Sequence, residues 1–160
     1  LMLLFGVISI CLYFFTSLYI ESYVYNATRD IRTGAFTDSL GDYASATTDA
    51  QRRAKFKELV CNRTPSPSDC MASMQVIIQG YTGGFGSIAK PSCKKIDNTL
   101  IDTATAETSS TEVGPDQPVL VTACYEWKFG GQLPFFKIGN MANGSHLIQS
   151  SQTFRTEPFK

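Results

Sequence analysis

Residues 1–20 read LMLLFGVISICLYFFTSLYI, and the first charged residue after them is Glu21. A helix of about twenty residues extends roughly 30 Å, which matches the hydrocarbon thickness of a bilayer. The helical pattern continues through ESYVYNATRDIR, and Gly34 is a suitable residue to end it. We therefore expect one long helix over residues 1–34, with an apolar half and an amphipathic half.

Two other interpretations of the apolar run are a helix in the core of a soluble domain and the apolar part of a signal peptide. A core helix rarely lacks charge on every face for about five turns. A signal peptide has a basic start and a small-residue cleavage site, and the run shows neither. We favour a helix that is inserted in a membrane or packed in the core of a polymer.

The remainder, residues 35–160, has room for one modest domain. The chain carries 14 Lys and Arg and 14 Asp and Glu residues, so nothing favours nucleic acid as a partner. Residues 35–49 are small and polar and predict a surface connection. Asp49 is then placed to cap a short helix that ends at Cys61. The apolar stripe of this helix consists of Phe56, Leu59 and Val60.

The other faces of the short helix are basic, with Arg52, Arg53, Lys55 and Lys57. Such a run either binds anionic lipid headgroups or simply faces solvent. We favour the solvated face, because the run is short and Glu58 dilutes it.

Three β-strands are expected, at residues 74–81, 119–129 and 145–155, the last after the Asn143-Gly144 turn. The second and third should lie antiparallel. One face of the second strand should pack on the first helix, and it consists of Val119, Val121, Ala123, Tyr125 and Trp127.

The expected fold class is therefore α+β, with a long N-terminal helix packed on a small antiparallel sheet and one further short helix. Residues 91–118 are rich in Thr, Ser, Ala and Asp and are expected to form an exposed loop.

Four cysteines lie in the soluble part: Cys61, Cys70, Cys93 and Cys124. An even number in a small exported domain indicates two disulfides. Cys61 and Cys70 flank a proline-rich turn and can close a short loop, which leaves Cys93 for Cys124. Three pairings are possible for four cysteines, and buried thiols in a reducing compartment are the other interpretation. The chain has no CxxC or CxxH spacing, so no zinc site is predicted.

The sequence predicts a protein that is not an enzyme and that uses no cofactor. Its single histidine, His146, has no nucleophile, second base or metal ligand near it in the sequence. Glu21, Phe135 and Phe136 are candidates for partner contact. Glu21 either faces headgroup water, which we favour, or pairs with a cation of a neighbouring subunit. The two phenylalanines are either core residues, which we favour, or an exposed patch for a partner.

Four stretches, at both ends and in the middle of the chain, resemble the sequence pattern of one known family. They are FGVISICLYFF at residues 5–15, NATRDIRTG at 26–34, FKELVCNRTPSPSDC at 56–70, and YEWKFGGQLPFFKIGNMANGSHLIQSSQTFRTEPF at 125–159. Together they resemble the TadE-like minor pseudopilins of the TadE/TadG-like family. Residues 91–118 carry none of the resemblance.

The resemblance implies a pilin-like fold and a minor component of the tight-adherence (Flp, type IVc) pilus system of bacteria. Such components are needed for pilus assembly, surface adhesion and biofilm formation. The implied location is the inner membrane, with one membrane pass and residues 35–160 in the periplasm, or at the cell surface once assembled. The implied partners are membrane lipid, other pilins or pseudopilins, and the pilus assembly platform.

Two family features are not matched. Family members are cleaved by a prepilin peptidase, at a site expected ahead of Leu1, and they often carry Glu in the apolar run, where this chain has Ser9. The alternative function is a membrane-tethered binding or adhesin module that does not polymerise.

Overall fold

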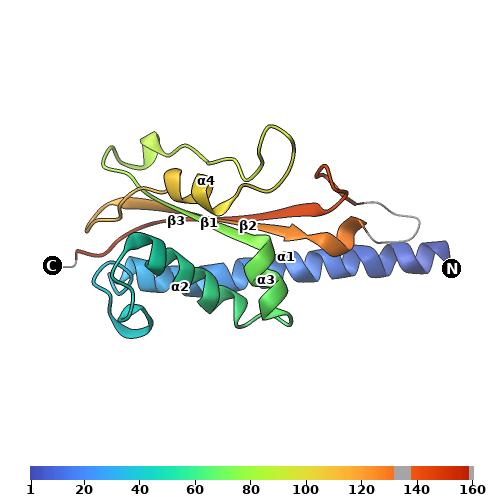
Figure 1. The fold of residues 1–160 in the computed structure, drawn as a ribbon, viewed down its shortest axis with the longest axis horizontal. Helices are drawn as coiled ribbons and strands as arrows, with labels where there is room; N and C mark the ends of the chain where they lie inside the picture. The colour runs from blue at the N-terminus through green and yellow to red at the C-terminus, as the bar shows by residue number, and fades with distance from the viewer. Residues whose placement is uncertain (132–137, 159–160) are drawn as a thin grey trace.

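A computed structural model describes residues 1–131 and 138–158 of the chain (Figure 1). Its helices are α1 (Met2–Arg32), α2 (Asp49–Cys61), α3 (Pro67–Ser73) and α4 (Thr103–Thr108), and its strands are β1 (Met74–Gly80), β2 (Pro118–Trp127) and β3 (His146–Arg155). Single turns of 3-10 helix occur at Gly41–Tyr43, Phe85–Ser87 and Lys128–Gly131. The α+β class and the long N-terminal helix are confirmed. The structure has three further short α-helices where the sequence analysis expected one.

The sheet has the strand order β1-β2-β3 and is antiparallel throughout. The β1–β2 register runs from Met74 opposite Tyr125 to Gly80 opposite Val119. The β2–β3 pairing ends with Trp127 opposite His146. The expected antiparallel pairing of the last two strands is therefore confirmed. Because β2 is the central strand, most of its residues are buried on both faces of the sheet.

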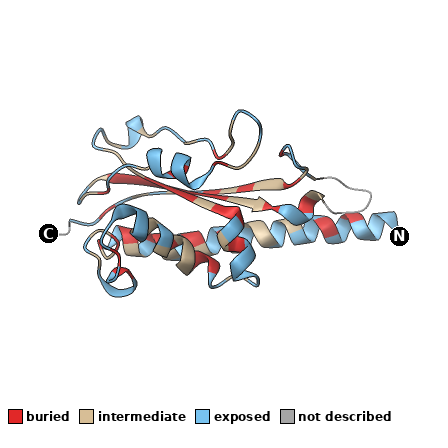
Figure 2. Cartoon of the chain, viewed as in Figure 1, coloured by how far each residue is buried: buried red, intermediate tan, exposed pale blue. Residues whose placement is uncertain are grey.

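One face of the sheet is covered by α1 and α2 (Figures 1 and 2). Ile20, Val24 and Ile31 of α1 belong to one buried cluster with the inner face of β2, as the alternation of that strand predicted. The β2 members of this cluster are Val119, Val121 and Ala123, and α2 contributes Phe56 and Val60. The expected apolar stripe of α2 is confirmed, with Leu59 half-buried against the cluster.

The opposite face of the sheet is covered by the segment expected to be an exposed loop. Most of residues 91–118 do contact solvent, but Ile101 and Ala106 are buried there against Ile77 and Cys124. The expectation of an exposed loop is therefore wrong for this part of the segment. The apolar outer face of β1 and β2 needs a cover, and α4 with its flanking turns supplies one although the segment has few large apolar residues.

The connection between α1 and α2 also differs from the expectation. Gly34 adopts a φ of 84°, which a glycine tolerates easily, and it ends the helix as predicted. The following residues are not all on the surface, because Phe36 and Tyr43 are buried, with ring centroids 5.3 Å apart. These two aromatic rings belong to the same buried cluster as α1 and α2.

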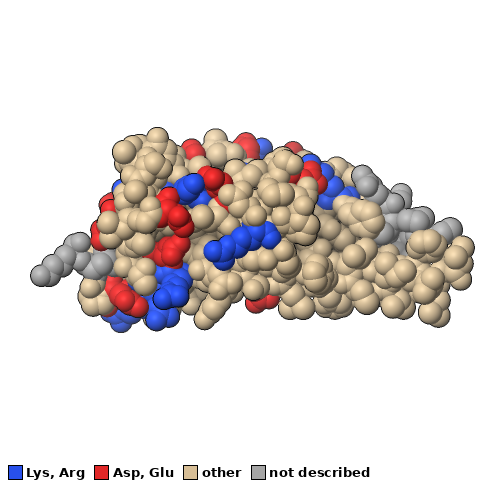
Figure 3. All heavy atoms as spheres, turned by 90° about the horizontal axis from the view of Figure 1, so that it is seen from below, with Lys and Arg blue, Asp and Glu red and all other residues tan. Residues whose placement is uncertain are grey.

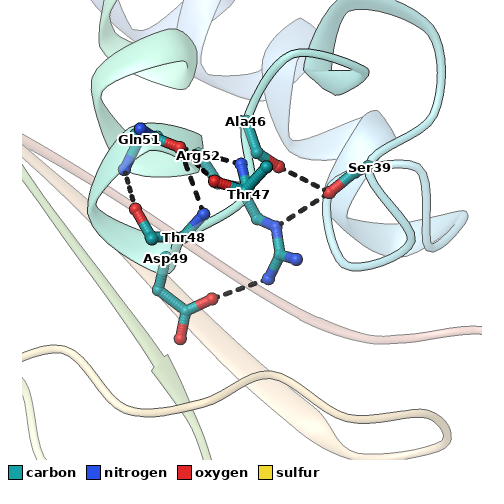
Figure 4. Close-up of polar contacts among 7 residues, drawn as sticks. All are labelled: Ser39, Ala46, Thr47, Thr48, Asp49, Gln51 and Arg52. Carbon is teal, nitrogen blue, oxygen red and sulfur yellow. Dashed lines mark hydrogen bonds and ion pairs between the residues drawn. The ribbon is translucent and has the colours of Figure 1, made fainter.

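Thr48 caps α2, and Asp49 is the first residue of the helix, so the cap lies one position earlier than the sequence analysis placed it (Figure 4). The Gln51 backbone N–H donates to Thr48 Oγ1 at 3.3 Å, and the Gln51 side-chain oxygen accepts from the Thr48 N–H at 3.2 Å. This reciprocal pair is a capping box. Asp49 instead pairs with Arg52, whose Nε donates to Ser39. These bonds fix the start of α2 against the preceding turn.

The cover on the outer face of the sheet can be tested with two alanines of α4. Ala106 is buried and Ala104 is exposed. Ala106→Asp should destabilise the protein by ~2–4 kcal/mol, because it places an unpaired charge beneath the sheet. Limited trypsin digestion should then cut faster at Lys94 and Lys95. Ala104→Asp, near the start of the same helix, is the control and should leave both the melting temperature and digestion unchanged. Equal behaviour of the two variants would contradict the packing of α4.

Candidate functional site

The most extensive candidate surface is the apolar outer face of α1. Its N-terminal half exposes large apolar side chains at Leu1–Phe5, Val7, Ile8, Ile10, Leu12, Phe14, Phe15 and Leu18 (Figure 2). Only 11% of the most apolar part of the helix is buried, so it is not a core helix among the described residues. By length and composition α1 can span a membrane.

Ser9 faces the opposite way and is buried. Its hydroxyl donates to the Phe5 carbonyl oxygen at 2.7 Å, so the polar group is satisfied within the helix. This is the position at which members of the resembled family often carry glutamate.

Glu21 lies on the exposed side of α1, one turn beyond Leu18. Within residues 1–131 and 138–158 it forms no ion pair. Both interpretations of this carboxylate, interfacial or paired with another subunit, therefore stay open. Phe135 and Phe136, the other candidates for partner contact, lie outside the described residues.

A groove of about 670 Å³ runs between the C-terminal half of α1 and the edge strand β3. Arg29 and Arg32 line one wall, and Phe154 and Glu157 line the other. The Glu157 backbone N–H donates to the Arg32 carbonyl oxygen at 2.9 Å, and the two side chains form an exposed ion pair at 3.4 Å. Two of the stretches that carry the family resemblance, at 26–34 and near the C-terminus, therefore meet in space.

Both disulfides favoured by the sequence are present. Cys61–Cys70 joins the end of α2 to α3, and Cys93–Cys124 joins the long segment to the middle of β2, with Cα atoms 5.5 and 5.6 Å apart. Disulfides form in oxidising compartments, so the fold suits an exported domain.

The sequence analysis missed an aromatic cluster at the end of the sheet nearest the N-terminus of α1. The Tyr13 ring lies 6.0 Å from Trp127 and 4.9 Å from His146, between centroids. His146 also bonds through Nδ1 to the Ile138 carbonyl oxygen, so its role here is in packing. The length of the strand could have predicted this contact of Tyr13 with the sheet. A ten-residue strand is roughly 33 Å long and needs about twenty residues of helix beside it, more than the amphipathic half of α1 supplies.

The basic run on α2 is partly neutralised. Arg52 pairs with Asp49 at 2.7 Å and Lys55 pairs with Glu58 at 3.1 Å. Lys57 is half-buried, and burial lowers its pKa. These contacts disfavour a lipid-binding patch, but all four basic residues are half-buried, so the face is less solvated than the sequence predicted. Among the described residues no cluster of three or more His, Cys, Asp or Glu side chains can hold a metal.

The end of α1 carries the clearest electrostatic strain. Burial raises the pKa of Asp30, and the nearby Asp42 carboxylate raises it further, while Arg29 and Arg63 act in the opposite direction. Burial likewise raises the pKa of Tyr43.

Comparison of the chain with family models, with characterised proteins and with solved structures finds no match. Function must therefore be argued from the surfaces described above.

The strained carboxylate predicts a pH dependence. The folded state holds the Asp30 proton more tightly than the unfolded state does, so the stability from this group falls as pH rises from 3.8 through the folded pKa. Asp30→Asn should raise the melting temperature at neutral pH. The corresponding gain in the free energy of unfolding is at most ~1 kcal/mol after solvent screening, and it should shrink as pH falls toward 3.8. Melting curves across this range test it, with Asp38→Asn on the following turn as the control. A gain that did not vary with pH would refute the assignment.

Proposed function

We propose that this chain is a minor pseudopilin, a structural and non-enzymatic component needed to assemble a Flp/Tad (type IVc) pilus. The observation that carries the proposal is the division of α1 into two environments. One half exposes an apolar surface long enough to span a membrane, and the other half is packed on the sheet of a folded domain.

The two environments suit a subunit that leaves a bilayer for a polymer. Lipid covers the apolar face of α1 while the protein is anchored, and helices of neighbouring subunits cover the same face once it is assembled. Both partners are apolar, so the transfer costs little hydrophobic free energy. The packing of the C-terminal half on β2 and β3 keeps the domain attached during the exchange.

The contact between residues 26–34 and the C-terminal segment gives further support. The resemblance rests on stretches that lie far apart in the chain, and Arg32 and Glu157 bring two of them together. Because this contact attaches the helix to the domain, it gives a structural reason why both stretches belong to the pattern of the resembled family.

The two disulfides support the part of this proposal that puts the domain in an oxidising compartment. The inferred arrangement is a single pass through the bacterial inner membrane, with residues 35–160 in the periplasm. Other pilins or pseudopilins and the assembly platform are the inferred partners, and adhesion and biofilm formation are the inferred consequences of assembly.

Deletion of the gene with complementation tests the proposal directly. Surface pili should disappear in electron micrographs while the level of the major pilin stays unchanged, and complementation should restore them. Normal pilus numbers combined with failure to attach would instead favour a tethered adhesin that does not polymerise. Normal pili and normal attachment would refute both functions.

A matched pair of leucines tests the role of the α1 surface. Leu18 on α1 and Leu40 beyond it are similarly exposed, at 65% and 59%. Leu18→Gln should reduce pilus number by about tenfold or more, because a polar group in an apolar helix interface is costly. Leu40→Gln should have no effect. Immunoblots of the membrane fraction must show equal amounts of both variants, and equal pilus numbers would exclude this part of α1 from subunit packing.

A further inference from the structure

The helical turns at residues 13–20 have one side exposed and the other side in contact with the domain. Their outer side exposes Phe14, Phe15 and Leu18, each at least 58% exposed, and this stretch contains no charged residue. Their inner side contacts the domain through Tyr13, whose ring packs near Trp127, and through Ile20, which is buried in the main cluster. About 12 Å of apolar helix is therefore already docked on the sheet.

Docking over this length constrains where a bilayer can lie. If the apolar run is covered by lipid up to Leu18, the end of the sheet that contacts Tyr13 must approach the bilayer surface. A domain held away from the lipid would leave Phe14, Phe15 and Leu18 in water, which is unfavourable for each of these large apolar side chains. The alternative is to undock α1 and expose Ile20, which is unfavourable for the same reason.

The end of the sheet has the composition of a membrane-interface surface. Phe129 is 44% exposed, and its ring lies 5.8 Å from that of Trp127. Lys128 between them is exposed, with only a long contact of 3.9 Å to Asp69. Aromatic rings are enriched at the headgroup level of membranes, where a lysine can extend toward anionic lipid.

Two further observations agree. On the face seen in Figure 3, most of the charged side chains lie away from the N-terminus of α1, and the surface drawn in tan at that terminus shows none. A mostly apolar cleft of about 180 Å³ opens at the same end of the domain, between Phe15 and Tyr19 of α1 and the turn at Thr64 and Pro65.

We infer that the end of the sheet around Trp127–Phe129 rests on the lipid bilayer, so that the anchored domain lies against the membrane and does not stand away from it. The inference rests on the proposed membrane anchoring. It adds a second lipid contact, made by the folded domain itself.

Tryptophan emission tests the inference in the full chain, whose only tryptophan is Trp127. The chain is reconstituted into vesicles of phosphatidylcholine and phosphatidylglycerol, with or without bromine on the phosphatidylcholine acyl chains near the headgroup. Two variants in a Trp127→Phe background move the reporter. Phe129→Trp places it on the inferred contact. Phe85→Trp places it on an exposed site beyond Gly80, at the opposite end of the sheet.

Bromination should reduce emission of the Phe129→Trp variant by about twofold and leave the Phe85→Trp variant unchanged. Quenching of both variants, or of neither, would overturn the inference. Contact with other copies of the chain in place of lipid would also overturn it, and it would appear as emission that changes with the protein-to-lipid ratio. Trp127 itself is only 7% exposed, so the Phe129→Trp variant, at a position that is 44% exposed, carries the test. Flotation of the vesicles in alkaline carbonate is measured alongside. A chain that fails to float refutes the anchoring, and a chain that floats without quenching refutes only the contact of the domain with lipid.

Discussion

Ile20, Val24 and Ile31 on α1 share a buried cluster with Val119 and Val121 on β2, and this contact of helix with sheet holds the fold together. Burial of each such side chain contributes about 1.5–3 kcal/mol, and a three-stranded sheet needs a packed face to be stable alone. The other elements on this face, α2 and the Phe36–Tyr43 pair, complete the same cluster. The helix that is long and apolar enough to span a membrane thus also contributes its C-terminal half to the core of the domain.

The parts of the fold that the sequence predicted are those that have a local pattern. The charge-free run of α1, the two faces of β2 and the turn before β3 each appear within about twenty consecutive residues. The disulfide pairing followed because a short loop between Cys61 and Cys70 left a single remaining pair. These features depend on spacing along one element, which a single sequence displays directly.

The errors concern contacts between segments far apart in the chain. Nothing near Ala106 indicates that it lies beneath the sheet, because a threonine-rich helix of six residues has no periodicity to measure. Phe36 and Tyr43 lie in a polar stretch of sequence. They are buried because they pack in the same cluster as α1 and α2. For the candidate site, the apolar outer face of α1 was predictable, whereas the role of Glu21 stays a prediction. The contact of Tyr13 with the sheet required comparing a strand length with a helix length.

The order of the elements also has a consequence for biogenesis. In chain order α1 is made before β2 and β3, which cover its amphipathic half. Val24 and Ile31 therefore lack their partners on the sheet until β2 and β3 have been made. Contacts of such long sequence separation form slowly and leave apolar surface exposed meanwhile. Folding of the domain is therefore completed only once β3 is available, and until then the apolar side chains of α1 are open to proteases and to capture by chaperones.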